Sequence, residues 1–234
     1  MTTIYLLRHG QASFGSHNYD QLSELGQRQS QILGGHLQGL GLRFDAIFSG
    51  SLARQQDTAR HACAQLAGEL PALETDPAFN EYDADGLFRA YLPRVLREDP
   101  ALAAAYQKLS QDRRLFQQAF IGVTRLWVEG ATPEHGELEP WKTFEARVQD
   151  GLRRLNAAHG KDAQVVVFTS GGVIAAGTAA ALELSPQRTL HLNWGIYNAS
   201  ITELKFRRSG PFLLGFNNIT HLRLAADPAL ITHR

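Results

Sequence analysis

Short apolar runs alternate with stretches of helical periodicity along this chain, and that alternation limits its fold more than any other feature. The runs have the length and composition of buried strands, and they cover residues 4–7, 46–48 and 164–169. Helical periodicity follows from Ser23 to Gly39 and over residues 51–66, 141–158 and 173–182. Strands and helices in this order predict an α/β fold with a largely parallel central sheet.

The remaining segments are expected to elaborate that sheet. Residues 76–86 are rich in turn formers, and residues 132–140 have the composition of a loop. Between them, residues 87–128 are expected to form a helical insertion, broken at Pro93 and Pro100. The segments 200–206 and 212–216 predict a terminal hairpin. With no repeat or flexible linker in the sequence, residues 1–234 are interpreted as a single domain.

The composition excludes several classes of protein. Because 23 Lys and Arg balance 23 Asp and Glu, the chain lacks the basic excess of a nucleic-acid-binding protein. Its one cysteine, Cys63, rules out an internal disulfide framework. The N-terminal residues lack the segments of a signal peptide, and no apolar run approaches the roughly 20 residues of a membrane span. We therefore expect a cytoplasmic protein with neither a nucleic-acid nor a membrane partner.

Polar residues stand directly at two of the expected strand ends. Arg8, His9 and Gly10 follow the first strand, and Ser170 and Gly171 follow the strand over 164–169. Ligands of open α/β sheets bind where strands end and loops begin, so these residues are candidates for a binding site. The alternative is that the Arg-His pair is solvated or satisfied by nearby carbonyl groups.

The sequence resembles the histidine phosphatase superfamily, which has the phosphoglycerate mutase-like fold. The resemblance rests on four motifs in the family's order; Arg-His-Gly alone is a weak signal, but the four together are specific. They are Leu6-Leu7-Arg8-His9-Gly10, Leu22-Ser23-Glu24-Leu25-Gly26, the segment from Phe48 to Ala59 with Arg54, and the segment 165–174. It implies a three-layer α/β/α fold with a mostly parallel central sheet and a helical insertion.

The resemblance also implies a mechanism that needs neither a metal nor a cofactor. His9 would be the nucleophile that forms a phosphohistidine intermediate, and Arg8 and Arg54 would bind the phosphoryl oxygens. Glu81 lies where the family carries an acidic residue and would protonate the leaving oxygen. Asp83 and Asp85 lie close to Glu81 in the sequence and are alternatives for that role.

Two departures from the family pattern bear on activity. Ser170 stands where the family has a second histidine, although the N–H groups that open the next helix, Gly171 first, can still bind an anion. Exchanging a charged donor for a neutral one costs about 1–3 kcal/mol, or roughly 10- to 100-fold in rate. A Ser170→His variant is then expected to be faster. In addition, Gly15 stands in place of the family's asparagine contact to phosphate, for which Ser13, Ser16 or a backbone amide would substitute.

The favoured function is a metal-independent phosphomonoester hydrolase of reduced activity, with a small phosphorylated substrate or inorganic phosphate as ligand. A phosphate-ester-binding or scaffold protein without efficient turnover is the alternative, and a phosphoglycerate-type mutase ranks third. The absence of a Gly-x-Ser-x-Gly elbow and of a Walker-type loop argues against a serine hydrolase and a P-loop nucleotidase. The insertion over 87–128 and the loop over 132–140 are expected to select the substrate. The sequence predicts neither the identity of that substrate nor the oligomeric state of the protein.

Overall fold

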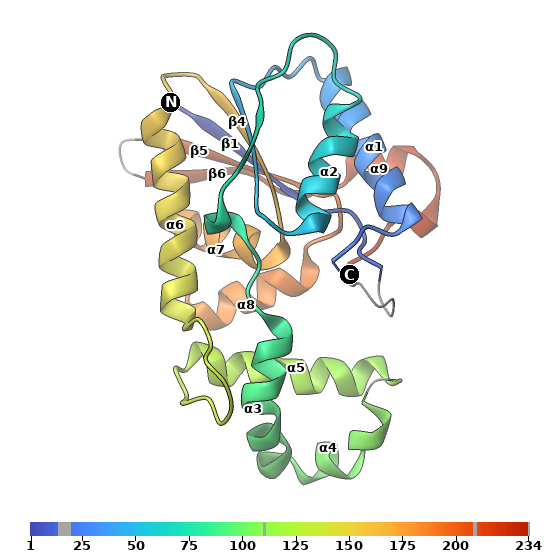
Figure 1. Ribbon diagram of the computed structural model, residues 1–234, viewed down its shortest axis with the longest axis vertical. Coiled ribbons are helices and arrows are strands. Elements are labelled where there is room, and N and C mark those ends of the chain that lie inside the picture. The colour runs from blue at the N-terminus through green and yellow to red at the C-terminus, as the bar shows by residue number, and fades with distance from the viewer. Residues whose placement is uncertain (14–19, 110, 208–209, 234) are drawn as a thin grey trace. The chain divides into compact units, whose positions relative to one another are not determined.

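A computed structural model describes residues 1–13, 20–109, 111–207 and 210–233. Six strands form one sheet in the order β3-β2-β4-β1-β5-β6 (Figure 1). The strands are β1 (Thr3–Arg8), β2 (Ala46–Ser49), β3 (Leu73–Thr75), β4 (Gln164–Thr169), β5 (Ile201–Arg207) and β6 (Gly210–Asn218). Strands β1 to β4 pair in parallel, whereas β5 pairs antiparallel with both β1 and β6. The sheet is therefore mostly parallel, as the sequence predicts.

Nine α-helices lie within the described part of the chain. They are α1 (Glu24–Gly39), α2 (Ala53–Cys63), α3 (Ala84–Glu98), α4 (Pro100–Ala104), α5 (Arg113–Val128), α6 (Trp141–Ala158), α7 (Gly171–Leu182), α8 (Pro186–Gly195) and α9 (Thr220–Leu224). Short 3₁₀ helices cover Pro77–Phe79, Tyr106–Lys108 and Pro228–Leu230. None of the described helices is both long and apolar enough to cross a bilayer.

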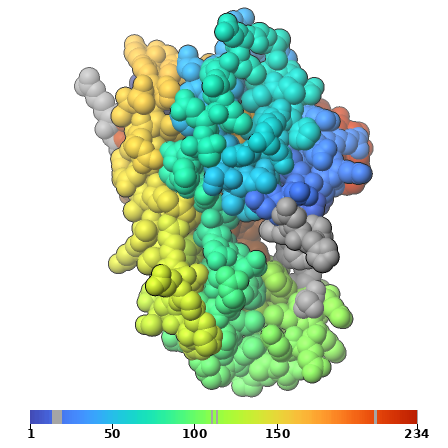
Figure 2. Space-filling view, viewed as in Figure 1, coloured from blue at the N-terminus to red at the C-terminus, as the bar shows by residue number. Residues whose placement is uncertain are grey.

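Helices cover both faces of the sheet, because alternate side chains of the buried strands point to opposite sides. On one face Leu7 of β1 belongs to an apolar cluster with Leu33 of α1 and residues of α2. Helices α1 and α2 lie side by side over this face (Figures 1 and 2). On the other face a Cβ added to Gly177 of α7 would lie 3.1 Å from Leu6 and 3.2 Å from Leu152 of α6. The result is the three-layer α/β/α fold.

The sequence predicted the strongly patterned elements correctly, including β1, β2, β4, α6 and the terminal hairpin. It missed β3, α8 and α9. The prediction that Pro93 breaks the insertion is wrong, because Pro93 lies inside α3. A proline removes one backbone hydrogen bond from a helix, and here the buried face that includes Leu87, Tyr91 and Val95 holds α3 together on both sides of it. Pro100, by contrast, starts a new helix as the first residue of α4.

Contacts divide the chain into two compact units. The first consists of Met1–Glu81 with Arg147–Arg234 and contains the sheet; the second is Tyr82–Ala146 and contains α3 to α5. Aromatic rings form the core of the second unit, where Trp127 lies 4.9 Å from Tyr82 and 5.1 Å from Trp141 between ring centroids. The expected insertion over 87–128 falls inside this unit, and the assignment of residues 1–234 to one domain stays a prediction.

Candidate active site

The first strand ends on a histidine that is held at its backbone from two sides. Arg8 pairs with Thr169 of β4, and the next residue, His9, donates its N–H to the Thr169 carbonyl at 2.9 Å. The His9 carbonyl accepts a hydrogen bond from Nδ2 of Asn198 at 3.1 Å. Beyond it the chain passes very close to α1, because a Cβ added to Gly10 would lie 2.3 Å from the Gly26 carbonyl oxygen. Only glycine fits at that approach.

Hydrogen bonds determine which nitrogen of the His9 ring carries the proton. Nδ1 lies 2.7 Å from the Gly10 carbonyl oxygen, and a carbonyl can only accept, so Nδ1 carries the hydrogen. Nε2 lies 3.3 Å from Nε of Arg54, which donates to it. The two contacts agree on a neutral imidazole whose Nε2 lone pair points toward the guanidinium side of the site.

The surroundings of His9 keep this ring neutral. Its side chain is 5% exposed, and burial is the largest cause that holds the pKa of His9 well below its ordinary value. The guanidinium groups of Arg54 and Arg8 lower the pKa further, against the opposing effect of the Gly10 carbonyl. His9 is therefore unprotonated at neutral pH.

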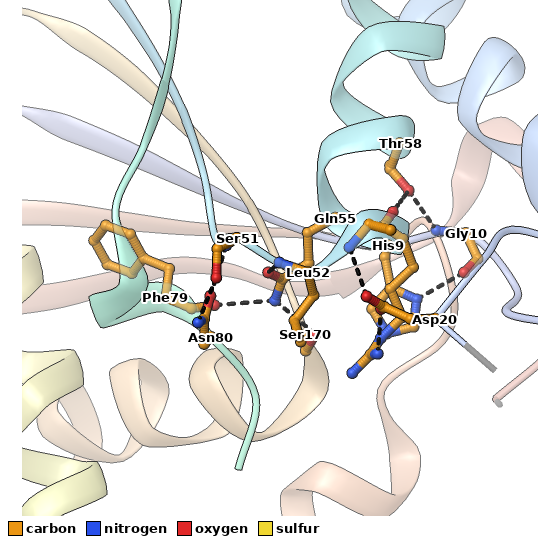
Figure 3. A network of polar contacts seen from close by, with 12 residues as sticks. His9, Gly10, Asp20, Ser51, Leu52, Gln55, Thr58, Phe79, Asn80 and Ser170 are labelled. Atoms are coloured by element: carbon orange, nitrogen blue, oxygen red, sulfur yellow. Dashed lines mark hydrogen bonds and ion pairs between the residues drawn. The ribbon is translucent and has the colours of Figure 1, made fainter. Parts of the chain in front are cut away.

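Arg54 is oriented by an acidic residue that the sequence analysis did not name. The first turn of α2 carries Arg54, whose Nη1 donates to Oδ1 of Asp20 at 2.7 Å. The other carboxylate oxygen of Asp20 accepts the N–H of Ala53 at 2.8 Å. Figure 3 shows Asp20 beside His9 in this network. Asp20 thus fixes both the start of α2 and the direction of its arginine.

Arg8 is anchored beside the first turn of α7. Its Nη1 donates to the backbone carbonyls of Ile196 and His233, the latter at 2.9 Å. A Cβ added to Gly171 would lie 3.7 Å from Nε of Arg8 and 2.3 Å from Oδ1 of Asn193. Gly171 is the first residue of α7, where N–H groups have no acceptor within the helix. The guanidinium of Arg8 therefore lies beside the N-terminus of α7, and both of these groups favour anions.

Ser170 and Glu81 complete the group of predicted residues. Ser170 has no exposed surface, and its Oγ accepts a hydrogen bond from Nε2 of Gln55 at 2.9 Å. Oε2 of Glu81 accepts the N–H of Gly172 at 3.0 Å, so this carboxylate also lies at the start of α7. Asp83 instead caps α3 in the second unit by accepting the N–H of Gly86 at 2.8 Å.

The first unit thus brings the predicted residues to neighbouring ends of β1, β4, α2 and α7: Arg8, His9, Arg54, Glu81, Ser170 and Gly171. Of the candidates for the missing asparagine contact, Gly15 and Ser16 lie outside the described residues. Ser13 is described, and its N–H donates to the Gln21 carbonyl at 2.8 Å. Within the described residues, no three or more His, Cys, Asp and Glu side chains gather in a way that could hold a metal ion.

Asp20 and Gln55 are the site contacts that the sequence analysis missed. Asp20 carries no sequence signal, since its partners lie more than 30 residues away. Gln55 carries one, because it shares helical spacing with Thr58, Ala59 and Ala62, and all four are buried. A glutamine in the buried stripe of a helix needs hydrogen-bond partners, and that requirement points to a polar interior.

Solved structures of other proteins share this fold. A phosphoglycerate mutase from Bacillus anthracis has a TM-score of 0.65 at 18% identity, covering 97% of both chains. A phosphoserine phosphatase from Entamoeba histolytica has a TM-score of 0.64 at 20% identity, covering 95% of this chain and all of the other. A mycobacterial glucosyl-3-phosphoglycerate phosphatase has a TM-score of 0.61 at 24% identity, covering 92% and 98%. The fold is phosphoglycerate mutase-like.

The chain belongs to the histidine phosphatase superfamily (branch 1), whose family model matches residues 4–219. Among curated relatives, a 2,3-bisphosphoglycerate-dependent phosphoglycerate mutase from Brucella ovis is 35% identical over 89 residues. That match spans 35% of this chain and 42% of the relative, so the chain spans about two fifths of the curated relatives it matches. Membership of this family supports an enzyme of the phosphatase type.

Proposed function

We propose that this protein is a metal-independent phosphomonoester hydrolase that works through a phosphohistidine on His9. The observation that carries the proposal is the His9 ring, buried and neutral, with its Nε2 lone pair on the side of the Arg54 guanidinium. A neutral imidazole is a nucleophile at physiological pH, and adjacent cations draw a phosphoryl group toward it. Stabilising the spread negative charge of that group is most of what phosphoryl transfer requires.

Each neighbouring residue has a role in this mechanism. His9 Nε2 attacks phosphorus as the bond to the leaving oxygen breaks, and Arg8, Arg54 and the Gly171 N–H bind the equatorial oxygens. Glu81 gives a proton to the leaving oxygen and later takes one from the water that attacks the phosphohistidine. Its position at the start of α7, with Asp83 engaged as a helix cap, supports Glu81 over the neighbouring aspartates.

Ser170 is part of this proposal as the residue at the family's second histidine position. A hydroxyl donates one neutral hydrogen bond where a protonated imidazole donates a charged one. We expect turnover that is slower by roughly 10- to 100-fold but not abolished, because the nucleophile and both arginines are present.

The same serine favours a second candidate, a phosphate-ester-binding protein without efficient turnover. Such a protein would use the same cations to hold an anion without releasing product. The mutase relatives keep phosphoglycerate-type transfer as a third candidate. That reaction needs a phosphorylated intermediate protected from water, and no contact among the described residues favours it over hydrolysis.

The test measures release of phosphate from an aryl phosphate between pH 5 and 8, with and without a chelator. The wild type is compared with His9→Ala and with His61→Ala, in which a half-buried histidine of α2 is removed as a control. We expect chelator-resistant turnover that His61→Ala retains and His9→Ala loses. Turnover no greater than that of His9→Ala refutes the hydrolase, and thermal stabilisation by inorganic phosphate without turnover establishes the second candidate.

A further inference from the structure

Gln55 is a polar side chain near His9 whose amide is held by three hydrogen bonds. It is fully buried on α2, one residue after Arg54. Its Oε1 accepts the N–H of Leu52 at 3.3 Å, and its Nε2 donates to the Phe79 carbonyl at 3.0 Å and to Oγ of Ser170 at 2.9 Å (Figure 3). All the hydrogen-bonding capacity of the amide nitrogen is used within the protein.

The backbone partners fix which way the Gln55 amide points. The Leu52 N–H can only donate, so it faces the amide oxygen, and the Phe79 carbonyl can only accept, so it faces the nitrogen. The amide nitrogen has no lone pair to offer, and Ser170 Oγ is therefore the acceptor in its contact with Gln55. The hydrogen of the Ser170 hydroxyl must point elsewhere.

That hydrogen has no acceptor among the residues that the structure describes. Ser170 is the N-cap of α7, yet its side chain accepts no hydrogen bond from the helix and accepts one from Gln55 instead. A fully buried hydroxyl that donates to nothing is costly unless a ligand accepts the bond. Ser170 directly follows Thr169, whose carbonyl accepts the His9 N–H, so the residue with the unused donor is next in sequence to the backbone partner of the nucleophile.

Packing holds the amide in place. A Cβ added to Gly50 would lie 2.0 Å from Oε1 of Gln55 and 2.7 Å from Oδ1 of Asn80. The amide therefore fills the space between the end of β2 and Ser170, and it cannot swing toward Gly50. No other orientation satisfies Leu52, Phe79 and Ser170 together.

We propose that Gln55 is a positioning residue that makes Ser170 a hydrogen-bond donor to the phosphoryl oxygens held beside His9. By donating to one lone pair of the Ser170 hydroxyl, Gln55 excludes the orientation in which the proton points at Gln55, and so favours a proton directed toward the ligand. The inference rests on the proposed function, and it makes Gln55 and Ser170 a coupled pair that supplies the donor in place of an imidazole.

The pair also changes what is expected of a histidine at position 170. The Ser170 side chain has no exposed surface, and the Gln55 amide lies 2.9 Å from its oxygen. An imidazole has no room there while Gln55 stays. Ser170→His alone is therefore expected to be less stable and slower than wild type, contrary to the expectation from sequence. The double variant Gln55→Ala/Ser170→His makes room for the imidazole and is expected to turn over faster than Ser170→His alone.

The test is a double-mutant cycle of Gln55→Met and Ser170→Ala. Methionine keeps the length of the side chain without its donors. If Gln55 acts through Ser170, each single variant lowers kcat about tenfold. The double variant then has about the same kcat as either single variant. Gln56→Met is the matched control, since Gln56 is the next residue on α2 and contacts Thr75 and Arg60 instead, and it should keep wild-type kcat.

A merely structural role predicts a different result. If Gln55 only stabilises the fold, Gln55→Met lowers the melting temperature alike in both backgrounds, and its effect on kcat either is absent or multiplies with that of Ser170→Ala. Either kcat result overturns the proposal. Should Gln55→Met fail to fold, the comparison of Ser170→His with Gln55→Ala/Ser170→His tests the proposal instead. A Ser170→His single variant that melts like wild type and turns over faster refutes the positioning role.

The proposed function is judged separately, by wild type against His9→Ala. If the wild type does not hydrolyse the aryl phosphate, the same cycle is measured by calorimetry as the Kd of inorganic phosphate. The expected pattern is then an approximately tenfold loss of affinity in each single variant without further loss in the double variant. Additive losses, no losses, or no phosphate binding by the wild type overturn the role of Gln55.

Discussion

Replacing Arg54 with methionine tests how far the guanidinium serves both the phosphoryl group and the nucleophile. Methionine keeps an apolar stem in α2 but loses the donors to His9 at 3.3 Å and to Asp20 at 2.7 Å. A charge-assisted hydrogen bond to a phosphoryl oxygen is worth about 1.5–3 kcal/mol. On the proposed mechanism, kcat/KM is expected to fall roughly 10- to 150-fold.

The same substitution changes the pH dependence in a known direction. Burial, the largest cause of the lowered pKa of His9, persists in Arg54→Met, as does the effect of Arg8, but the contribution of Arg54 is lost. The pKa of His9 therefore rises in the variant. Because a protonated imidazole has no lone pair to attack phosphorus, the acid limb of kcat/KM should move to higher pH.

The assay is the profile of kcat/KM from pH 4.5 to 8 for wild type and Arg54→Met on one aryl phosphate, so that ionisation of the substrate is common to both. Arg60→Met is the control, since Arg60 lies on the same helix, is exposed and pairs with Asp57. We expect the control to follow wild type in rate and in pH dependence. An Arg54→Met profile that coincides with that of wild type refutes the proposed contact between Arg54 and the nucleophile.

Three further predictions concern the fold, the proton donor and the acid stability. Gly10→Ala, whose Cβ would lie 2.3 Å from the Gly26 carbonyl oxygen, should lower the free energy of unfolding by about 1–3 kcal/mol in urea. Its control, Gly35→Ala, has open space in α1 and should raise that free energy by up to about 1 kcal/mol. Glu81→Gln should slow an alkyl phosphate more than an aryl phosphate, because the poorer leaving group depends more on proton donation; equal slowing would remove Glu81 from that role. Burial, aided by His36, lowers the pKa of His221 from 6.5 to about 4, so the unfolded chain binds this proton first as pH falls. Roughly 3 kcal/mol of stability should be lost between pH 6.5 and 4 for this reason, and urea unfolding of His221→Phe should show a smaller loss than wild type.

The elements with strong local patterns were predictable from sequence because their patterns report burial directly. The valine run of β4 is buried along almost its whole length, and the apolar spacing of α6 gave its bounds to the residue. Strand β3 gave no such signal, since all three of its residues are exposed and it exists by pairing with β2. Helix α8 did carry a signal that was missed, the cap Ser185 followed by a proline at the first helical position.

The residues of the site also fall into two groups, those that the sequence indicates and those that it does not. Arg8 and His9 were identifiable because polar residues at the end of a buried strand conflict with their surroundings unless they face a polar site. The partners that orient them were not identifiable. Asp20 reaches Arg54 across 34 residues of sequence and Gln55 reaches Ser170 across 115, and such contacts are set by how α2 packs on the sheet.

Trapping the phosphorylated enzyme tests the central claim most directly. The protein is mixed with an alkyl phosphate, quenched within the first turnovers in alkaline denaturant, where phosphohistidine survives, and digested for mass spectrometry. We predict one phosphoryl group on the peptide that contains His9, removed by acid treatment and absent from His9→Ala. Continued turnover with no phosphoryl group on the protein, or with one on Ser170 or another residue, would contradict the account.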